Sequence, residues 1–323
     1  MLNDPDNKEL ALKISFTNKV SNKVLEIVEN NFDKKIVIES GEWEGLGQEI
    51  FRLIKRPNIL FVTRIHTPLA TCIKQNNLRR SASSALQLIS EYKTIISADC
   101  VTACTNYVKE RMIEDVLGKN CLFSEDIRVI PNPIDSELFK LVQTDREASI
   151  NFVNSILGRD FLTDKTFNVF IIGSVEDRKG VKYVIDAIPA VVDSLSNIRF
   201  CFVGHCGIDE DINLNANTKL SPKKLLDRIP EKYHSVVAFT NYIDHKDLPL
   251  LIQCGDVFPI MSIGDNFPGT VAEISLSSKP ILALARGGVK EMLTDSQGRF
   301  MAFNLGESLD LATSNLVRGI KIL

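Results

Sequence analysis

The second half of the chain alternates short apolar runs with stretches whose apolar residues recur at helical spacing. The apolar runs predict buried strands at 168–173, 198–204, 236–240, 256–260 and 280–285. The helical spacing predicts helices over 181–195, 245–253, 270–278 and 307–322. Strands that alternate with helices form right-handed βαβ units, so we expect a parallel sheet with helices on both faces.

The first half shows the same alternation less completely. Strands are predicted at 34–39, 58–65, 100–105 and 127–131, and helices near 20–30, 84–95 and 106–117. A mixed polar stretch, which opens with the turn signal Asn132-Pro133, separates the two halves. We therefore expect an α/β protein with two Rossmann-like, doubly wound domains. They are a partial N-terminal domain over 1–140, a linker over 141–165 and a C-terminal domain over 166–323.

Composition and charge exclude several classes of function. The 323 residues suffice for two domains, at roughly 150 residues each. A net charge of −3 provides no basic excess to displace phosphate counterions, so no nucleic-acid partner is expected. The N-terminus is charged, and no apolar run approaches the roughly 18 residues of a membrane helix. Together with seven cysteines that form no CxxC pair, this favours a cytoplasmic protein with reduced thiols.

The segment Gly173–Gly180 follows a predicted strand and precedes a predicted helix. Parallel α/β sheets bind ligands beyond the carboxyl ends of their strands. Backbone N–H groups at such a position hold anions, and Arg178 and Lys179 add positive charge. The segment lacks the GxxxxGK[ST] pattern of a Walker loop. From its residues alone, a plain loop with solvated charges is an equal alternative.

A second segment, Ser262–Glu273, also lies between a strand and a helix. Its carboxylates Asp265 and Glu273 are separated by seven residues, and Gly269 lets a ligand approach the backbone closely. A structural alternative is a capping box over Thr270–Glu273, in which Glu273 would accept the Thr270 N–H.

These two segments, together with VIPNPIDSELF and FCFVG, resemble the family 4 retaining glycosyltransferases (glycosyl transferases group 1) in order and spacing over about residues 56–300. The resemblance implies the GT-B fold, two Rossmann-like domains that face a cleft. It implies a sugar transferred with retention from a nucleotide-diphosphate sugar to a glycan or lipid-linked acceptor, as in polysaccharide biosynthesis. No cofactor or metal is implied. Peripheral association with the inner face of the membrane stays open.

The resemblance also assigns roles in the C-terminal domain. Glu273 would hold the ribose hydroxyls, and Asp265 would contact the donor sugar near the reacting carbon, where glutamate is commoner in the family. Lys179 matches the lysine that binds the diphosphate. Ser174 stands where the family usually has a second cation, and Arg178 is the candidate to replace it. The donor-facing backbone would be that of Asn266, Phe267, Pro268, Gly269 and Thr270.

In the N-terminal half, NILFVTRIHTPLA resembles the family segment whose strand ends in a histidine that faces the donor sugar. His66 is the matching residue, and a structural histidine at a strand end is the alternative. We interpret the histidines at 205, 234 and 245 as surface residues, with 205 the candidate exception. The acidic run 209–211 is interpreted as a solvated loop, not as a DxD metal site.

The chain also departs from the family pattern. No strand with a glycine-rich loop precedes Lys34, and Gly45-Leu-Gly47 occurs in a different context. We therefore expect a chain trimmed at both ends relative to the family. Two other functions stay open, namely a non-catalytic or degenerate nucleotide-sugar-binding paralog and a sugar-nucleotide epimerase. A nicotinamide-dependent dehydrogenase is disfavoured because no GxGxxG follows any predicted strand.

Overall fold

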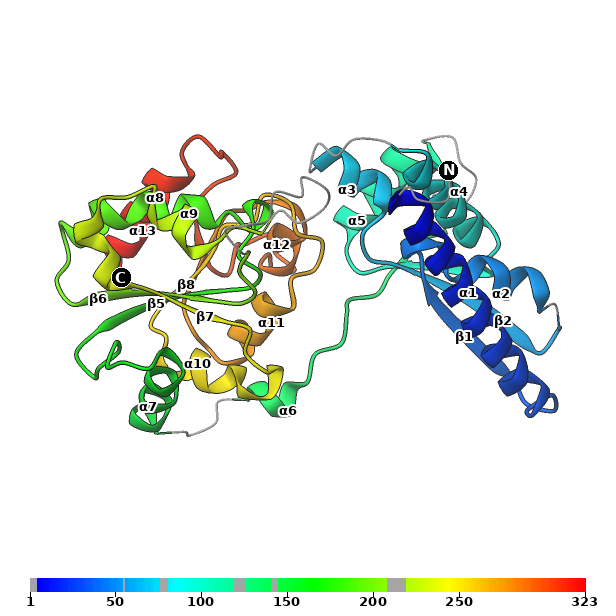
Figure 1. Ribbon diagram of the computed structural model, residues 1–323, viewed down its shortest axis with the longest axis horizontal. Coiled ribbons are helices and arrows are strands. Elements are labelled where there is room, and N and C mark those ends of the chain that lie inside the picture. The colour runs from blue at the N-terminus through cyan, green and yellow to red at the C-terminus, as the bar shows by residue number, and fades with distance from the viewer. Residues whose placement is uncertain (1–4, 55, 76–80, 119–125, 141–144, 208–218) are drawn as a thin grey trace. The chain divides into compact units, whose positions relative to one another are not determined.

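The computed structural model describes residues 5–54, 56–75, 81–118, 126–140, 145–207 and 219–323. The chain divides into two compact units, residues 1–132 and 133–323 (Figure 1). Each unit is built on a parallel sheet with helices, as the alternation of apolar runs and helical patterns predicts.

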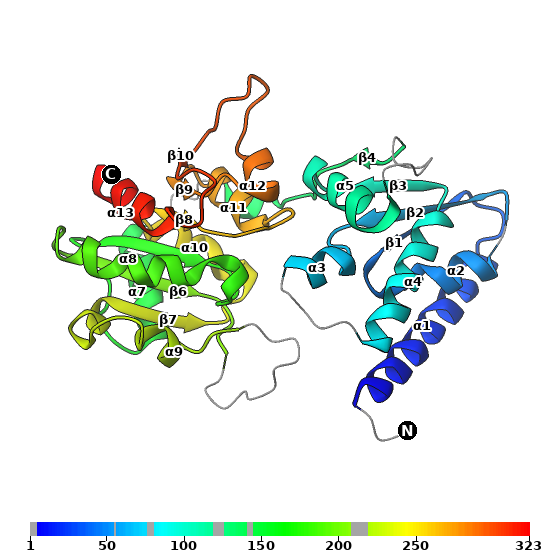
Figure 2. The same ribbon diagram turned by 90° about the horizontal axis from the view of Figure 1, so that it is seen from above.

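The second unit has a doubly wound sheet. Its strands are β5 (Phe167–Ile172), β6 (Ile198–Val203), β7 (Val237–Asn241), β8 (Phe258–Ile260), β9 (Ile281–Ala283) and β10 (Phe303–Asn304). They form two parallel groups, β5-β6-β7 and β10-β9-β8 (Figure 2). A parallel bridge between Val169 and Val257 joins the groups. The resulting order, β7-β6-β5-β8-β9-β10, reverses direction between β5 and β8. Ligands of such sheets bind at this switch point.

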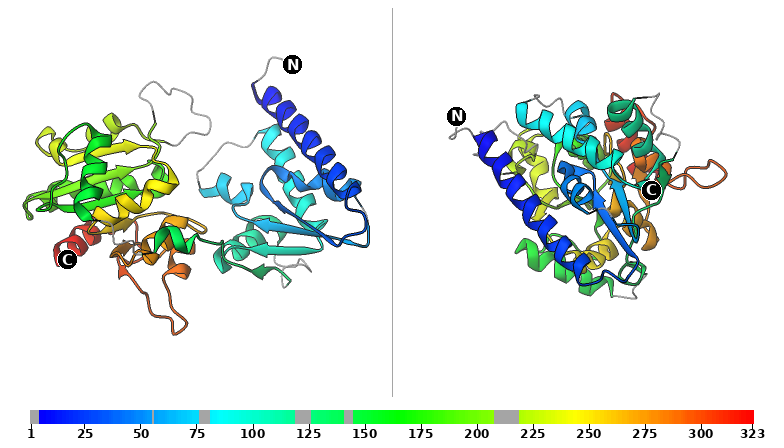
Figure 3. Two further views of the ribbon diagram at one scale, coloured as in Figure 1. Left: turned by 90° about the horizontal axis from the view of Figure 1, so that it is seen from below. Right: turned by 90° about the vertical axis from the view of Figure 1, so that its right-hand side faces the viewer.

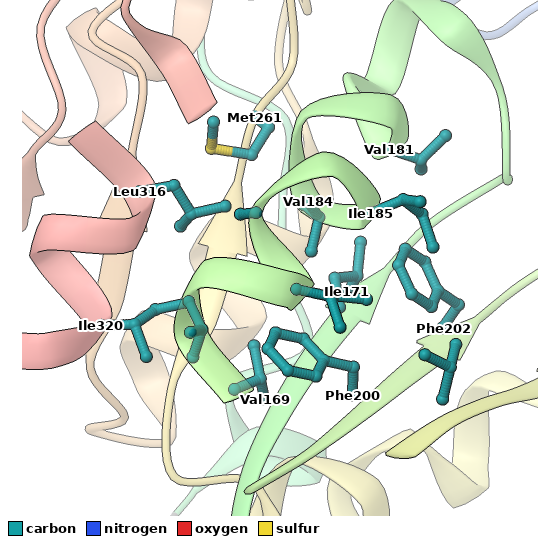
Figure 4. Close-up of a cluster of buried hydrophobic side chains, with 14 of the residues drawn as sticks. Val169, Ile171, Val181, Val184, Ile185, Phe200, Phe202, Met261, Leu316 and Ile320 are labelled. Carbon is teal, nitrogen blue, oxygen red and sulfur yellow. The ribbon is translucent and has the colours of Figure 1, made fainter. Parts of the chain in front are cut away.

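Helices cover both faces of this sheet. On one side lie α8 (Val181–Val192) and α13 (Ala312–Ile322), and on the other lie α7 (Arg146–Leu157) and α10 (Leu248–Cys254) (Figure 1). Strand residues alternate between the faces, so Val169 and Ile171 pack under α8 with Phe200 and Phe202 (Figure 4), while Phe170 joins the opposite core. The spacing that predicts α8 is the spacing of its buried residues, Val181, Val184, Ile185, Ile188 and Val191.

The boundary between the units differs from the predicted one. The sequence places a linker at 141–165, whereas the structure forms α7 from Arg146–Leu157 and assigns it to the second unit. Ile150 and Val153 of this helix are buried against the core that contains Phe170. Polar residues make up the other half of α7, and with the polar residues that flank the helix they give the segment the composition of a linker.

In addition to the helices named above, the second unit has short helices. These are α6 (Ser136–Phe139), α9 (Pro222–Leu226), α11 (Gly269–Leu276) and α12 (Gly287–Met292). Single 3₁₀ turns lie at Asp177–Lys179 and at His245–Asp247. The predicted strands and the helices at 181–195, 245–253, 270–278 and 307–322 are confirmed, with ends that shift by a few residues.

The first unit has a four-stranded parallel sheet in the order β1-β2-β3-β4. Its strands are β1 (Ile36–Gly41), β2 (Ile59–Ile65), β3 (Cys100–Ala103) and β4 (Arg128–Val129), all of them predicted. Its helices are α1 (Pro5–Glu29), α2 (Gly47–Leu53), α3 (Leu69–Gln75), α4 (Ala82–Ile96) and α5 (Asn106–Met112), the last continued by a π turn (Figure 3). The helices α2 and α3 were not predicted, because seven residues are too few to show a helical period.

Within the part of the chain that the structure describes, no helix combines the length and the apolar character needed to cross a bilayer.

Candidate functional site

The loops after β5 and β8 meet at the switch point of the second unit. A small hollow between them is lined by the strand ends and by Gly173, Ser174, Lys179, Ser262, Pro268 and Thr270. The two loops that the sequence singles out, Gly173–Gly180 and Ser262–Glu273, thus form one site although Ser262 follows Gly180 by 82 positions. The parallel order of the sheet brings them together.

Gly180 allows this close approach. Its φ is +69°, and a Cβ atom placed there would lie 2.0 Å from the Met261 carbonyl oxygen. Any other residue would therefore be strained and would separate the loops. The Ile263 N–H donates to the Arg178 carbonyl at 2.9 Å, which ties the loops together directly.

Asp265 is the centre of a charged cluster and is only 5% exposed. Lys179 Nζ lies 2.6 Å from its Oδ2, Arg178 pairs with its Oδ1, and the Ser262 hydroxyl donates to Oδ2 at 2.7 Å. Burial alone would raise the pKa of Asp265. The charges of Lys179 and Arg178, with hydrogen bonds from Lys179 and Ser262, outweigh burial and lower that pKa below its usual range. Asp265 is therefore held as a carboxylate.

The second cation of this cluster is shared between two acids. Arg178 also pairs with Glu176 at 2.7 Å. Burial would lower the pKa of Arg178, but Asp265 and Glu176 raise it above its ordinary value. Ser174, which by the resemblance stands where the family usually has a cation, lines the hollow. The positive charge at this site therefore comes from Arg178 and Lys179, two neighbouring residues of one 3₁₀ turn.

The backbone after Asp265 leads directly into α11. Asn266 and Phe267 are half-buried, and Pro268 is the N-cap of a helix whose first residues are Gly269 and Thr270. The start of α12 packs on this segment. The Gly288 N–H donates to the Asp265 carbonyl at 2.8 Å, and a Cβ atom on Gly288 would lie 1.8 Å from the Asn266 carbonyl oxygen.

Glu273 does not form the capping box, because the α11 N-cap is Pro268 and no side chain caps it. Its Oε1 is instead hydrogen-bonded to His245 Nε2 at 2.9 Å. Its Oε2 is buried and has no hydrogen-bond partner among the residues that the structure describes. A buried carboxylate oxygen that lacks a donor costs free energy, so this atom is suited to accept a hydrogen bond from a ligand.

His245 was interpreted from sequence as a surface residue. Its side chain is indeed 59% exposed, but its bond to Glu273 makes it part of the site. The other two interpretations also need detail. His205 is exposed and stacks on Tyr242 with ring centroids 4.8 Å apart. His234 is half-buried, and its Nε2 lies 3.0 Å from the Leu226 carbonyl oxygen. The acidic run 209–211 lies outside the described residues.

The predicted site residue of the first unit is His66, which is exposed directly after β2. Its backbone N–H and that of Thr67 both donate to the carboxylate of Glu42, at 2.9 and 2.6 Å. Glu42 follows β1 and is fully buried. Burial raises its pKa, and the two N–H groups, which lower it, only partly oppose that rise. Sequence reasoning did not identify Glu42, whose only signal is its position after a strand.

Comparisons with known proteins agree with this architecture. Residues 166–315 match the family Glycosyl transferases group 1. Sucrose-phosphate synthase from Thermosynechococcus elongatus has a TM-score of 0.69 to this chain at 16% identity, over 99% of this chain and 70% of the synthase. The fold is GT-B. The family match lies within the second unit, and the likeness to these structures shows the fold.

Two further GT-B structures have ligands. The catalytic domain of Starch Synthase IV from Arabidopsis thaliana, bound to ADP and acarbose, has a TM-score of 0.65 at 15% identity, over 94% of this chain and 68% of its own. An E. coli structure, described as trehalose-6-phosphate bound with UDP-2-fluoro glucose, has a TM-score of 0.68 at 14% identity, over 96% and 70%. A search of curated proteins found no match.

Proposed function

We propose that this chain transfers a sugar from a nucleoside-diphosphate sugar to a glycan or lipid-linked acceptor, with retention of the anomeric configuration. The observation that carries the proposal is the cluster of Asp265 with Arg178 and Lys179 at the switch point of the GT-B second unit. A diphosphate needs cations there, and a departing diphosphate is stabilised by cations that are already in place. The match of residues 166–315 to group 1 glycosyltransferases supports the same reading.

Each residue of the site has a role in this proposal. Lys179 and Arg178 bind the diphosphate, and Glu273 accepts hydrogen bonds from the ribose hydroxyls. The backbone from Asn266 into α11 faces the sugar and diphosphate, where a helix N-terminus favours negative charge. When the donor binds, Asp265 gives up its contact with one of these cations and contacts the sugar. In the first unit, His66 is proposed to face the donor sugar.

The ligands named for two similar structures support the donor class. One is bound to ADP and acarbose, and the other to UDP-2-fluoro glucose. We therefore propose a nucleoside diphosphate as the leaving group. The reaction is proposed to need no metal and to occur in the cytoplasm, with a lipid-linked acceptor met at the inner face of the membrane. Donor binding is then expected to be unchanged by EDTA.

Isothermal titration calorimetry with UDP-, GDP- and ADP-sugars tests donor binding, and failure of all three to bind would overturn the proposal. Turnover is then measured in the wild type and in Asp265→Asn and Glu273→Gln. Both variants are expected to lose transfer while keeping the wild-type circular dichroism spectrum. Asp177→Asn is the matched control, because Asp177 lies on the same loop, is exposed and its carboxylate pairs only weakly with Lys182, at 4.0 Å.

A second candidate is a nucleotide-sugar-binding protein without turnover. Two observations favour it: Ser174 adds no charge at the place of the usual cation, and both oxygens of Asp265 are already engaged by protein groups. Donor binding without transfer or hydrolysis would select this candidate. Conversion of the donor sugar in the absence of an acceptor would instead indicate an epimerase.

A further inference from the structure

The two carboxylate oxygens of Glu273 differ in their hydrogen bonding. The residue lies in the second turn of α11, and its side chain is 9% exposed. Oε1 is hydrogen-bonded to His245 Nε2 at 2.9 Å, whereas Oε2 is buried with no partner among the residues that the structure describes. One oxygen is thus fixed by the protein, and the other remains to be satisfied.

The imidazole of His245 is itself held in place. It packs edge-on against Phe139, with ring centroids 5.2 Å apart and an interplanar angle of 65°. Phe139 is fully buried, and its carbonyl accepts the Ser277 hydroxyl at 3.3 Å. Ser277 follows Glu273 by one turn and also bonds the Glu273 carbonyl at 3.0 Å. The His245 ring and the Glu273 carboxylate are therefore both held in place by contacts at the C-terminal end of α11.

We propose that His245 is a positioning residue, which fixes Glu273 so that its second oxygen accepts a hydrogen bond from the vicinal diol of a nucleotide ribose. The inference rests on the proposed function, because it takes the nucleotide to lie against Glu273. A carboxylate with one oxygen bound to His245 retains lone pairs for both hydroxyls of a diol. Without the histidine the side chain would have to be ordered during binding, at a cost in affinity.

The ribose diol provides a direct test. Binding of UDP, ADP and GDP is measured by calorimetry and compared with binding of the matching 2′,3′-dideoxy diphosphates. The wild type is expected to prefer the diol by about tenfold or more, because hydrogen bonds to charged groups are the stronger kind. In His245→Phe, which keeps an aromatic ring beside Phe139 but has no N–H, this preference is expected to fall severalfold. His245→Gln, which restores an N–H donor, is expected to regain most of it.

Lys246→Ala is the matched control, because Lys246 lies on the same 3₁₀ turn and pairs only weakly with Asp244, at 3.9 Å. It is expected to leave the diol preference unchanged. An unchanged preference in folded His245→Phe, with nucleotides still bound, would overturn this inference and leave the proposed function intact. A wild type that binds the diphosphates without a diol preference would overturn this inference together with the ribose role of Glu273, and would leave the proposed sugar transfer intact. A wild type that binds none of them would overturn both proposals.

Discussion

Each unit has a buried carboxylate near a strand end, and the two are stabilised in opposite ways. Glu42 follows β1 in the first unit and accepts the backbone N–H groups of His66 and Thr67. Asp265 follows β8 in the second unit and is paired with two cations. Burial dominates at Glu42 and raises its pKa, whereas the cations prevail at Asp265 and lower its pKa.

The contrast distinguishes a carboxylate that shapes the chain from one suited to meet a ligand. The backbone N–H groups that Glu42 accepts are fixed in position, so Glu42 holds the turn after β2 and these donors are not released to a ligand. The cations of Asp265 are side chains that are 30% and 22% exposed, so a ligand can compete for them. Four changes test this contrast, in order of decreasing expected effect.

The largest effect is expected from Asp265→Asn. Under the proposed function, loss of this charge removes electrostatic stabilisation at the reacting centre, and the transfer rate is expected to fall about 100- to 1,000-fold. Initial rates at saturating donor measure the loss. Glu42→Gln is the comparison from the first unit and is expected to cost less, because the amide oxygen still accepts a backbone N–H. Equal losses in the two variants would remove the distinction between the two carboxylates.

The next effect concerns the glycines that support each carboxylate. Gly180 and Gly45 both have φ near +70°, and a Cβ atom would lie 2.0 Å from Met261 O at the first and 2.4 Å from Ser90 Cβ at the second. Alanine at either is expected to lower the free energy of unfolding by about 2 to 4 kcal/mol, from backbone strain and overpacking together. Denaturant titrations measure this, with circular dichroism for the whole chain and Trp43 fluorescence for the first unit.

Matched controls exist in both units. Gly158 and Gly118 also have positive φ, but no atom lies within 4 Å of a Cβ placed on them. Alanine at these positions therefore reports the strain alone. We expect about 1 to 2 kcal/mol at Gly158, which is in the left-handed helical region, and about 1 to 3 kcal/mol at Gly118, whose ψ of 149° lies outside that region. If Gly180→Ala and Gly45→Ala cost no more than these controls, close approach of the loops is not what the two glycines provide. Gly45 belongs to Gly45-Leu-Gly47, a glycine pair to which the sequence assigns no role. The structure shows that Gly45 lets this turn pack closely against Ser90 of α4.

The sequence predicts the strands well because most are short apolar runs, and some end directly before a glycine, as Ile172 and Val203 do. It also identifies both loops of the second unit. What it could not provide is the contact of Lys179 with Asp265, which spans 86 residues and exists only because β5 and β8 are neighbours. The family resemblance assigns both residues to the donor site, but it does not imply this contact.

His245 and Glu42 show where such prediction fails. His245 lies in a polar segment, and nothing local distinguishes it from a solvated histidine; its role comes from Glu273, 28 residues away. Glu42 lies in a run with Trp43 and glycines that has no recognisable motif, and its burial results from α4 and the strand ends packing around it. In both cases tertiary packing, and not local pattern, gives a polar side chain its partner.

The third test is the pH dependence of stability. Folded Glu42 binds its proton more tightly than unfolded Glu42, so its contribution is complete below its ordinary pKa of 4.5 and is lost as the pH rises through the raised value. Asp265 behaves oppositely, because its contribution is present above 3.8 and is lost as the pH falls through the lowered pKa. Denaturant titrations from pH 3 to 8 measure both.

Each variant isolates one of these terms. Glu42→Gln is expected to lose less stability than the wild type as the pH rises above 4.5. Asp265→Asn is expected to lose less than the wild type as the pH falls below 3.8. Differences from the wild type that have the same sign of slope in both variants would contradict the opposite shifts.

The smallest effect is expected from His66→Ala. The bond from His66 to Glu42 uses the backbone N–H, which alanine supplies equally well, and the side chain is exposed. The free energy of unfolding is therefore expected to change by only about 0.5 kcal/mol, as at ordinary surface positions. Thr67→Pro removes an N–H that donates to Glu42 at 2.6 Å, and it should cost several times more because a buried carboxylate loses a donor. If the alanine variant were the more destabilised of the two, the imidazole and not the backbone would hold the turn, and Glu42 would resemble Asp265 in depending on a side chain.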